Sequence, residues 1–483
     1  MNRTLRWFDT ITLNIYFLGL TTLSQTNGLI LPLLVQQFIG EEQKATYYGR
    51  LRLWTLMVAL LSQALMGLLS DHSTLRWGRR RPFIFTGTLL DLAFLTVIGF
   101  SAGMQSLTGF WFLFTIAIFL QVSSNMAQAA QQGLIPDLVP ESQRGRYSGI
   151  KVVMELPIPM LVVAFTVGRL VAAGHTWAGI LVAMGVLVLV MLATMLVPEQ
   201  PLLEKPPTLD WAPFLRLALM TGVFTLIILG SGAATKTLGG WLGQELQLGQ
   251  GLLIAVMGMT GLAAMIVTIW LGVWVSIRLS IGEEAARRNP SFTWWVVNRL
   301  SFLVGTVNLS TFAIYFLQAR LGYVKEKAAA PASILIMLVG VFILLSALPS
   351  GWLADRFGRK SLTAISGGLA ALGTLVALLL PNLTIIYVGG CLIGVATGLF
   401  YAANWALGTD LVPKEQAGRF LGLSNLAGAG AGAIGAYIGG PIADYITANL
   451  PQIPGLGYII LFSIYGTLFL FSTLALRGIQ QVK

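Results

Sequence analysis

Amide side chains recur along one apolar stretch of the sequence at the spacing of an α-helix face. Gln121, Asn125, Gln128 and Gln132 follow one another at steps of four, three and four residues within 108–136, which places them on one side of a helix. An amide offers both a donor and an acceptor, so such a row can bind neighbouring hydroxyl groups. Amides that faced lipid would lack partners at a high cost, so we expect this row to face an interior cavity.

Polar side chains gather on three other apolar stretches. They are Gln25 and Asn27 in 11–38, Asn298, Asn308 and Tyr315 in 294–319, and Tyr401, Asn404 and Trp405 in 384–409. We expect these groups to line the same cavity and to bind a neutral, hydroxyl-rich molecule, with Trp405 stacked on a sugar ring. Two alternatives stay open: amide bonding between helices, worth about 0.6 kcal/mol each on average, and ordinary packing of Tyr401 and Trp405.

Three ionisable residues, Asp91, Glu155 and Arg299, lie well inside apolar stretches. Each costs about 2.5–3.5 kcal/mol at the bilayer centre on insertion scales, so each requires a reason. Burial favours the neutral form of a carboxylic acid, which makes Glu155 and Asp91 candidate proton carriers. The alternative for Glu155 is an i,i+4 pair with Lys151, and for Asp91 a bond to a neighbouring helix.

Two charged loops between apolar stretches share one pattern. The first, Gly67–Gly87, holds Asp71 and then four arginines that include Arg79 and Arg80; the second, Gly351–Lys360, holds Asp355 and Arg359. Another pair of similar stretches follows two apolar runs downstream in each case. Asp137-Leu-Val-Pro, ending in Arg144-Gly-Arg, matches Asp410-Leu-Val-Pro, ending in Gly-Arg419. Two motifs repeated in the same order indicate a duplicated bundle.

The composition sets the elements that must position these residues. The chain has 483 residues, of which 56% are hydrophobic and 10% charged, with a mean hydropathy of +0.78. These values are typical of an all-α polytopic membrane protein and not of a soluble one. The expected helices are 11–38, 45–70, 82–103, 108–136, 147–172, 176–197, 213–231, 252–278, 294–319, 329–354, 361–380, 384–409, 420–445 and 455–476.

The chain falls into four parts, three of which hold these fourteen helices. They are an N-terminal six-helix bundle (1–197), a Pro-rich cytoplasmic linker (198–212), an inserted helix pair with a charged loop (213–293) and a C-terminal six-helix bundle (294–483). The charged loop is Gly282–Asn289. The short 213–231 helix is followed by Gly-rich polar sequence, so an in-plane hairpin is the alternative there.

The positive charge of the chain, +11 at pH 7, reports topology and contact with anionic lipid rather than nucleic acid. Most lysines and arginines fall on one side of the expected spans, so we expect an inner cell membrane protein with both termini in the cytoplasm. Cys391 is the single cysteine, so no disulfide framework forms. We found no metal cluster, nucleophile elbow or phosphate loop, and we expect no enzyme activity and no cofactor.

The charged loops resemble those between helices 2 and 3, and 8 and 9, of the major facilitator superfamily. The run Asp71…Gly78-Arg-Arg-Arg-Pro-Phe-Ile84, together with Asn125-Met-Ala-Gln128, is most similar to the sucrose and disaccharide proton symporters of the glycoside-pentoside-hexuronide:cation group. The resemblance implies two six-helix bundles in which helices 1, 4, 7 and 10 line a central cavity. The amide rows fall on those four helices.

The resemblance also implies a cytoplasmic latch, because in this superfamily the acid of each loop meets a helix N-terminus of the opposite half. The implied gating residues are Asp71, Arg79, Arg80, Arg144, Asp355, Arg359, Asp410 and Arg419, with Asp137 and Arg144 as a charge pair. A solvated basic loop that only sets topology is the alternative. In the related symporters an arginine stands where this chain has Gln132, and its aspartate corresponds to Asp137, which becomes a third candidate proton carrier. Gln63 replaces the aspartate of the melibiose-type sodium symporters, so sodium coupling is less expected.

We therefore predict a monomeric secondary transporter that moves a neutral sugar or glycoside with protons by alternating access. Two alternatives come from other classes. One is an exporter of amphiphilic compounds, which the inserted helix pair favours and for which the cavity would be mostly apolar. The other is a lipid-handling or assembly protein without ion coupling.

Overall fold

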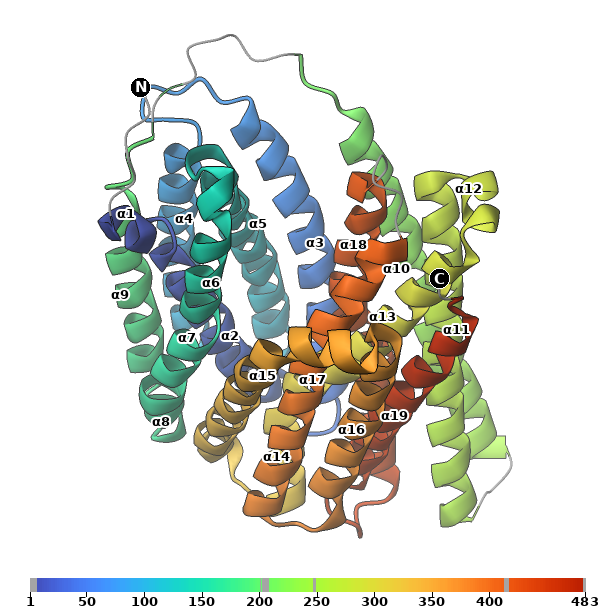
Figure 1. The fold of residues 1–483 in the computed structure, drawn as a ribbon. Helices are drawn as coiled ribbons and strands as arrows, with labels where there is room; N and C mark the ends of the chain where they lie inside the picture. Colours follow the sequence, from blue (N-terminus) through green and yellow to red (C-terminus); the bar gives the residue numbers. More distant parts are fainter. Residues whose placement is uncertain (1–6, 200, 202–207, 246–248, 412–416, 481–483) are drawn as a thin grey trace. The chain divides into compact units, whose positions relative to one another are not determined.

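The computed structural model describes residues 7–199, 201, 208–245, 249–411 and 417–480 of the chain. No strand occurs in the part of the chain that it describes, and the regular elements are helices (Figure 1). The chain divides into two compact units. Unit 1 comprises Met1–Phe38 and Val58–Leu215, and unit 2 comprises Ile39–Met57 and Arg216–Lys483.

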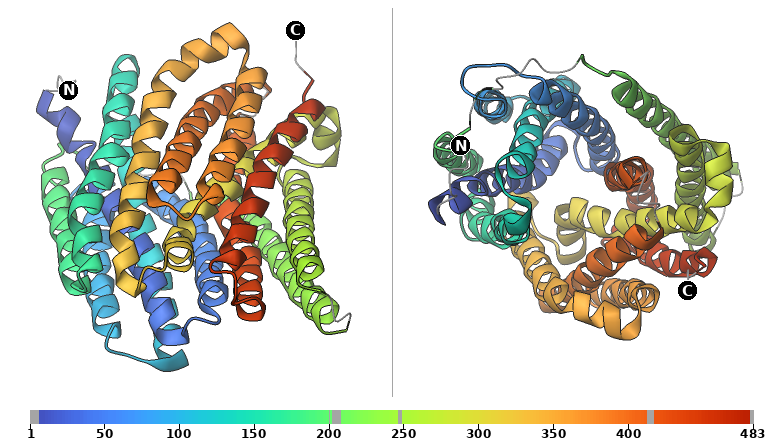
Figure 2. Two further views of the ribbon diagram at one scale, coloured as in Figure 1. Left: turned by 90° about the horizontal axis from the view of Figure 1, so that it is seen from below. Right: turned by 45° about the horizontal axis from the view of Figure 1, so that its top comes forward.

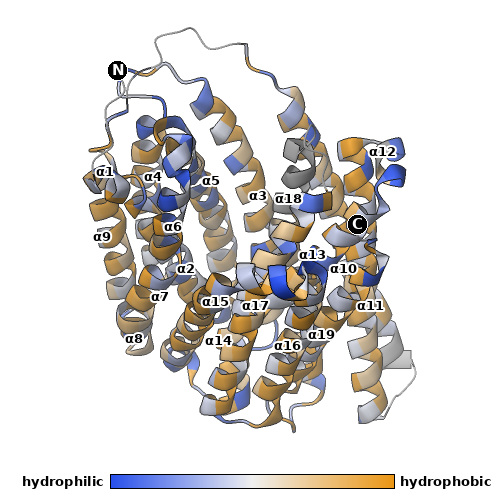
Figure 3. Ribbon diagram, viewed as in Figure 1, coloured by the Kyte–Doolittle hydropathy of each residue, from blue (hydrophilic) through white to orange (hydrophobic). Residues whose placement is uncertain are grey.

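Unit 1 holds the helices of the first half of the chain. They are α1 (Trp7–Thr12), α2 (Ile15–Ile39), the C-terminal part of α3 (Lys44–Asp71), α4 (Arg81–Ser101), α5 (Ser106–Leu138), α6 (Arg144–Glu155), α7 (Pro157–Val162), α8 (Gly168–Ala172) and α9 (Thr176–Thr194). Hydrophobic residues dominate these helices (Figure 3). A segment inside lipid must satisfy its own backbone groups, which is why such sequences form helices.

Two of the expected helices are broken in unit 1. The 11–38 helix consists of α1 and α2, and the 147–172 helix consists of α6, α7, the π-helical segment Val163–Val167 and α8. The second break falls at Leu156, directly before Pro157 and close to Pro159. Proline lacks a backbone N–H and disfavours helical geometry in the residue before it. The expected 147–172 helix is therefore one candidate span, Glu141–Ala172, with an irregular segment inside it.

Unit 2 holds the helices of the second half and the inserted pair. They are α10 (Ala212–Glu245), α11 (Gln250–Ile281), α12 (Glu283–Arg288), α13 (Pro290–Thr311), α14 (Ala313–Leu321), α15 (Ala329–Phe357), α16 (Arg359–Leu379), α17 (Leu383–Leu411), α18 (Ala417–Asn449) and α19 (Leu456–Ala475). Part of its core is an aromatic stack of Phe302 and Phe400, whose ring centroids are 3.7 Å apart. Phe469 packs against the same cluster.

The N-terminal half of α3 packs against α18 within unit 2. A side chain at Gly49 would overlap the backbone of Ala436, and one at Gly440 would overlap the backbone of Ala45, so both glycines allow close helix approach. The Asp444 carboxylate accepts hydrogen bonds from the backbone N–H groups of Ala45 (3.2 Å) and Thr46 (2.7 Å). This buried carboxylate therefore satisfies donors that the start of α3 leaves free.

The inserted helices α10 and α11 run side by side (Figure 2) and belong to unit 2. Phe224 of α10 packs against Gly272 of α11 and against Gly430 of α18. The α10 helix continues well past the expected end at residue 231, as far as Glu245, and its Ala212–Leu238 part is long and apolar enough to cross a membrane. The in-plane hairpin alternative is therefore not favoured.

The loop expected at Gly282–Asn289 contains the short helix α12, which corrects that prediction. Two i,i+4 pairs, Glu283 with Arg287 (2.6 Å) and Glu284 with Arg288, support it. The Arg287 guanidinium that hydrogen-bonds Glu283 also holds the pKa of that carboxyl below its ordinary value.

Among the described residues, 13 helices are long and apolar enough to cross a membrane, and a bent pair brings the number to 14. The bent pair is α13 with α14, which meet at 58°, so the expected 294–319 helix contains a bend within its span. The number of spans and the absence of strands in the described part confirm the predicted all-α polytopic fold.

Candidate functional site

The first charged loop of unit 1 forms a compact ion-pair cluster around Arg80, whose side chain is only 6% exposed. Its guanidinium donates to Asp137 (Nε to Oδ2, 2.9 Å) and to the Ser70 hydroxyl, and it pairs with Asp71. Arg79 pairs with Asp137 as well. We call these five residues the N-loop cluster. A side chain at Gly133 would overlap the Arg80 guanidinium, so the glycine makes room for it.

Glu199, which lies in the Pro-rich segment after α9, binds the backbone of the loop that carries the N-loop arginines. Its carboxylate accepts hydrogen bonds from the backbone N–H groups of Arg79 (2.9 Å), Arg80 (2.7 Å) and Arg81 (3.0 Å). Those donors lie at the start of α4, where a helix leaves its N–H groups unpaired and favours negative charge. Gly78 has φ +110° and lies against the same carboxylate, which leaves no space for a side chain there.

The second charged loop repeats part of this arrangement in unit 2. Arg359 pairs with Asp410, as Arg79 does with Asp137 in the other half, but their side chains are 37% and 53% exposed. Lys360 donates to the backbone carbonyl of Ile479 (2.7 Å) just beyond the last helix. Asp355 is exposed and has no hydrogen bond or ion pair within the described part of the chain.

The expected charge pair between Asp137 and Arg144 is not formed. Arg144 donates to the carbonyl groups of Val139 (3.2 Å) and Pro136 (3.1 Å) and pairs with Glu141 (3.6 Å). Asp137 is instead held by the N-loop arginines, which the loop brings closer. The side chain of Arg419 lies outside the described residues.

Three of the four amide side chains in the row on α5 are accessible. Gln121 and Gln128 are partly exposed, and Gln132 is exposed and accepts a hydrogen bond from Gln63 (3.2 Å). Asn125 is buried and donates to the carbonyl and side-chain oxygens of Gln121. Gln25 and Asn27 of α2 are also partly exposed. Neither of them, nor Gln128, has a hydrogen-bonding partner among the described residues.

The polar residues of α13 and α17 are instead mostly used within unit 2. Asn298 is fully buried and donates to the carbonyl and hydroxyl of Ser472 (2.8 Å each), while its Oδ1 accepts from Asn404 (2.7 Å). Asn308 is fully buried and donates to the carbonyls of Val304 and Ala431. Tyr315 on α14 is fully buried among aromatic rings. The open alternative of bonding between helices therefore describes Asn298 and Asn308 better than cavity lining does.

Asp91 on α4 is fully buried and has only hydroxyl partners. Its carboxyl group accepts hydrogen bonds from Ser123 and from Ser124 (3.1 Å), both on α5. No cation pairs with it within the described part of the chain. An ionised carboxylate in this position would lack the cationic partner that a buried charge requires. A neutral carboxylic acid requires no such partner.

The other two candidate proton carriers have cationic partners. Glu155 pairs with Lys151 (3.6 Å) and is 34% exposed, which is the simple i,i+4 pair considered above. Asp137 is paired with two arginines in the N-loop cluster. Both therefore have a reason to stay charged that Asp91 lacks.

Arg299 lies beside an accessible aromatic face of α17. Its guanidinium donates to Asn404 Oδ1 (3.0 Å) and lies 5.8 Å from the Trp295 ring and 5.5 Å from the Trp405 ring. Trp405 is 42% exposed and Tyr401 is 39% exposed, while Asn404 between them is fully buried. We call Arg299, Tyr401, Asn404 and Trp405 the α13/α17 cluster.

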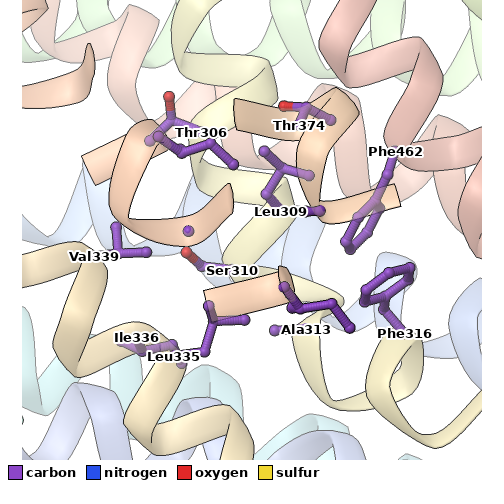
Figure 4. A pocket seen from close by; sticks show the side chains of 14 residues that line it. Thr306, Leu309, Ser310, Ala313, Phe316, Leu335, Ile336, Val339, Thr374 and Phe462 are labelled. Carbon is purple, nitrogen blue, oxygen red and sulfur yellow. The ribbon is translucent and has the colours of Figure 1, made fainter. Parts of the chain in front are cut away.

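A pocket in unit 2 lies next to the bend between α13 and α14 (Figure 4). About 550 Å³ of it is not filled by atoms, and part of that space is open to the surroundings. Its lining is apolar apart from Thr306, Ser310 and Thr374, and both threonines donate to carbonyls of their own helices. None of the predicted substrate-binding residues lines it, so it is separate from the amide rows.

Sequence reasoning missed three of these features. The linker pattern around Glu199 does not predict its contact with α4, the spacing of Ser123 and Ser124 does not connect them with Asp91, and Arg52 of α3 is absent from the predicted functional residues. Arg52 lies well inside an apolar run, has an unpartnered buried Nε and forms no ion pair among the described residues. A cation within a span was its available signal. The residues searched hold no group of three or more His, Cys, Asp or Glu side chains that could bind a metal.

Comparison with known proteins agrees with this architecture. The family model of the Major Facilitator Superfamily matches residues 16–317 and 280–436. A mutant of the nucleoside transporter NupG superposes with a TM-score of 0.66 at 12% identity and covers 97% of this chain and 99% of its own. A mutant of the peptide transporter POT in complex with alafosfalin gives a TM-score of 0.64 at 15% identity, with coverages of 97% and 93%. At such identities the likeness shows the fold alone.

Shorter segments are similar to sugar transporters. Human "Solute carrier family 2, facilitated glucose transporter member 12" is 33% identical over 107 residues, which is 22% of this chain and 16% of that protein. "Sucrose transport protein SUT1" of Oryza sativa subsp. japonica is 48% identical over 46 residues, or 10% and 9% of the two chains. The chain therefore spans less than a fifth of the length of these relatives.

Proposed function

The chain belongs to the Major Facilitator Superfamily, and from this premise we propose that it carries a sugar or glycoside across the membrane together with protons. The family and the fold make it a multi-pass transporter rather than an enzyme. Alternating access between two bundles is the mode of transport that we propose. The inner membrane, the cytoplasmic termini, the lipid contacts and the monomeric state stay predictions.

The observation that carries the sugar part of the proposal is the accessible amide row of α5. Gln121, Gln128 and Gln132 present amide groups on one helix face, and Gln25 and Asn27 present two more on α2. Each amide both donates and accepts, which suits the hydroxyl groups of a sugar. The similarity of short segments to glucose and sucrose transporters supports the same substrate class.

We propose Asp91 as the proton carrier. The carboxyl group is buried, is held by two serine hydroxyls and has no cationic partner in the described part of unit 1. A proton can therefore occupy it without breaking an ion pair, whereas Glu155 and Asp137 would each leave a cation unpaired. Proton uptake and release at Asp91 would couple the gradient to the conformational cycle.

We also propose that the charged loops form the cytoplasmic latch of the cycle. The Asp355 carboxylate has no partner within the residues described and is available for a helix N-terminus, where negative charge is favoured. The exposed pair of Arg359 and Asp410 can open at little cost.

The test is uptake by the purified protein in liposomes. We expect an inward proton gradient to drive accumulation of at least one radiolabelled sugar or glycoside from a panel, and a protonophore to abolish it. Uptake that ignores the proton gradient would remove proton coupling. A folded protein that moves none of the panel would remove the sugar assignment.

The Asp91→Asn variant tests the carrier. The amide keeps one acceptor oxygen for a serine, and its NH2 group can donate to the oxygen of the other serine, but it cannot release a proton, so we expect counterflow to persist while gradient-driven accumulation is lost. Glu155→Gln is the matched control, because it removes a partly exposed acid from a span without touching this site. Equal loss of accumulation in both variants, or none in Asp91→Asn, would show that Asp91 is not the carrier.

A further inference from the structure

The guanidinium of Arg299 is held in place by neutral groups and has no anionic partner among the described residues. Its guanidinium has one hydrogen bond, to the neutral amide of Asn404, and its buried Nε has no partner. The rings of Trp295 and Trp405 flank it and add cation–π attraction, but they carry no charge. The side chain is therefore held in place while its positive charge stays uncompensated.

No carboxylate of the described residues supplies the missing charge. The ion pairs of unit 2 lie elsewhere, at Lys44–Glu41, Arg287–Glu283, Arg288–Glu284 and Arg359–Asp410. Asp444, which lies inside a span, is bonded to backbone N–H groups at the start of α3. A cation inside the membrane favours an anionic partner, and the chain provides none for Arg299 in the residues described.

The surroundings of Arg299 remain accessible to a ligand. Tyr401 and Trp405 lie one turn apart on α17 and are 39% and 42% exposed, although the Asn404 side chain between them is fully buried. Their ring faces can stack on the apolar face of a sugar ring. The guanidinium that can bind an acidic group of the ligand therefore lies beside the aromatic rings that can stack on its sugar ring.

We propose that the α13/α17 cluster binds the acidic group of an anionic sugar or glycoside, with Arg299 as the anchor for its carboxylate. This inference rests on the proposed function and specifies the charge of the substrate, which the amide rows alone had led us to expect as neutral. The planar guanidinium matches a carboxylate through two parallel N–H donors. Asn404 orients the guanidinium group of Arg299, and the rings of Tyr401 and Trp405 stack on the sugar ring.

The first experiment compares two probes that differ only in charge. Methyl β-glucuronide carries a carboxylate where methyl β-glucoside carries a CH₂OH group. We expect the purified protein to bind the glucuronide at least tenfold more tightly by isothermal titration calorimetry. Arg299→Gln should remove that preference, with a loss of about 10- to 100-fold for the acidic probe and little change for the neutral one.

The preference ratio is measured on one protein sample, so partial unfolding of a variant does not alter it. Arg299→Lys keeps the charge but loses the fork, and it should retain part of the preference. Arg278→Gln is the matched control, since that arginine also lies against a tryptophan, 3.4 Å from the Trp274 ring, but on the inserted helix α11. The control should leave the ratio unchanged.

The outcomes separate this inference from the proposed function. Tight binding of the neutral probe that Arg299→Gln does not affect would overturn the inference and leave sugar transport standing. Arg299-dependent binding of simple acids such as lactate, without binding of either sugar, would overturn the sugar assignment and keep the anion site. A preference lost in Arg52→Gln but kept in Arg299→Gln would move the site to α3 and overturn the assignment to Arg299.

A charge measurement gives a second readout. Cotransport of one proton with a monoanionic sugar moves no net charge, whereas cotransport with a neutral sugar moves one positive charge. In solid-supported membrane recordings we expect glucuronide uptake to produce little current under a proton gradient. A steady current of positive sign with glucuronide would contradict the proposed pairing of one proton with one acid.

Discussion

The two charged loops derive from one repeated motif and yet are built differently. In unit 1 the arginine at the centre is 6% exposed and contacts Asp71, Asp137 and Ser70, while Glu199 caps the following helix. In unit 2 the pair of Arg359 and Asp410, which corresponds to Arg79 and Asp137 (22% and 23% exposed), is 37% and 53% exposed. The same residue types therefore form a network around a buried arginine in one half and an exposed pair in the other.

The difference shows how burial, and not sequence motif, sets the strength of an ion pair. A buried charge that loses its partner is left in a medium that solvates it poorly, so the network holds tightly. An exposed pair exchanges its partner for water at little cost. We therefore expect unit 1 to keep its loop fixed while the loop of unit 2 changes partners during transport.

The largest effect should come from Arg80→Ala. The substitution removes the hydrogen bonds and ion pairs that Arg80 makes with Ser70, Asp71 and Asp137, although Asp137 keeps Arg79, and hydrogen bonds to charged groups contribute about 1.5–3 kcal/mol each. We expect a marked loss of thermal stability of the detergent-solubilised protein, measured by tryptophan fluorescence or by the temperature of aggregation. Arg80→Lys, which keeps the charge but not the fork, should lose less. If Arg80→Ala were no worse than Arg359→Ala, the contrast between the loops would be wrong.

Gly133→Ala should have the next largest effect, because it crowds the same arginine from the neighbouring helix. The added methyl group would overlap the guanidinium of Arg80, and forced repacking of this kind costs about 1–3 kcal/mol. Gly145→Ala is the matched control, since a side chain there meets nothing within 4 Å. The control should be neutral or slightly stabilising, because alanine suits a helix better than glycine. Equal melting temperatures for both variants would show that Arg80 is not packed as described.

Sequence reasoning captured the repeated parts of the fold and missed what lies between them. The loops with Asp71 and Asp355 and the paired Asp137 and Asp410 stretches are visible as duplicated patterns. The sequence places the polar residues of α13, like those of α5, on one side of a helix, but it does not say which element lies next to that side. Asn298 and Asn308 turn toward Ser472 and Ala431, far away in sequence, and no periodicity encodes such a partner.

The break in the helix after Glu155 has a local cause and could have been predicted. Pro157 and Pro159 stand in the middle of the 147–172 run, and each removes a backbone donor. The cap that Glu199 provides could not have been predicted, because no sequence pattern relates an acid in a Pro-rich linker to the start of α4. Its role depends on where the chain returns after α9, which is a tertiary property.

Removal of that cap should have a moderate effect. Glu199→Ala leaves the N–H groups of Arg79, Arg80 and Arg81 without their acceptor, and losing a helix cap costs about 0.5–2 kcal/mol. We expect a small fall in melting temperature and faster hydrogen exchange at the start of α4. Glu141→Ala is the control, because that acid is 89% exposed and forms only a long pair with Arg144. Unchanged exchange at residues 79–81 would mean that water or another group already satisfies these donors.

The smallest effect on stability should come from Arg359→Ala, which removes the one guanidinium bound to Asp410 in the described part of unit 2. An exposed pair contributes about 0.2–1 kcal/mol, so the melting temperature should hardly move. Transport should respond instead, because a pair that contributes little to stability can still favour one conformation over another by a factor of a few. We expect a changed ratio of forward to reverse uptake in liposomes of known protein orientation. A large loss of stability with unchanged transport would assign to unit 2 the rigid loop that we attribute to unit 1.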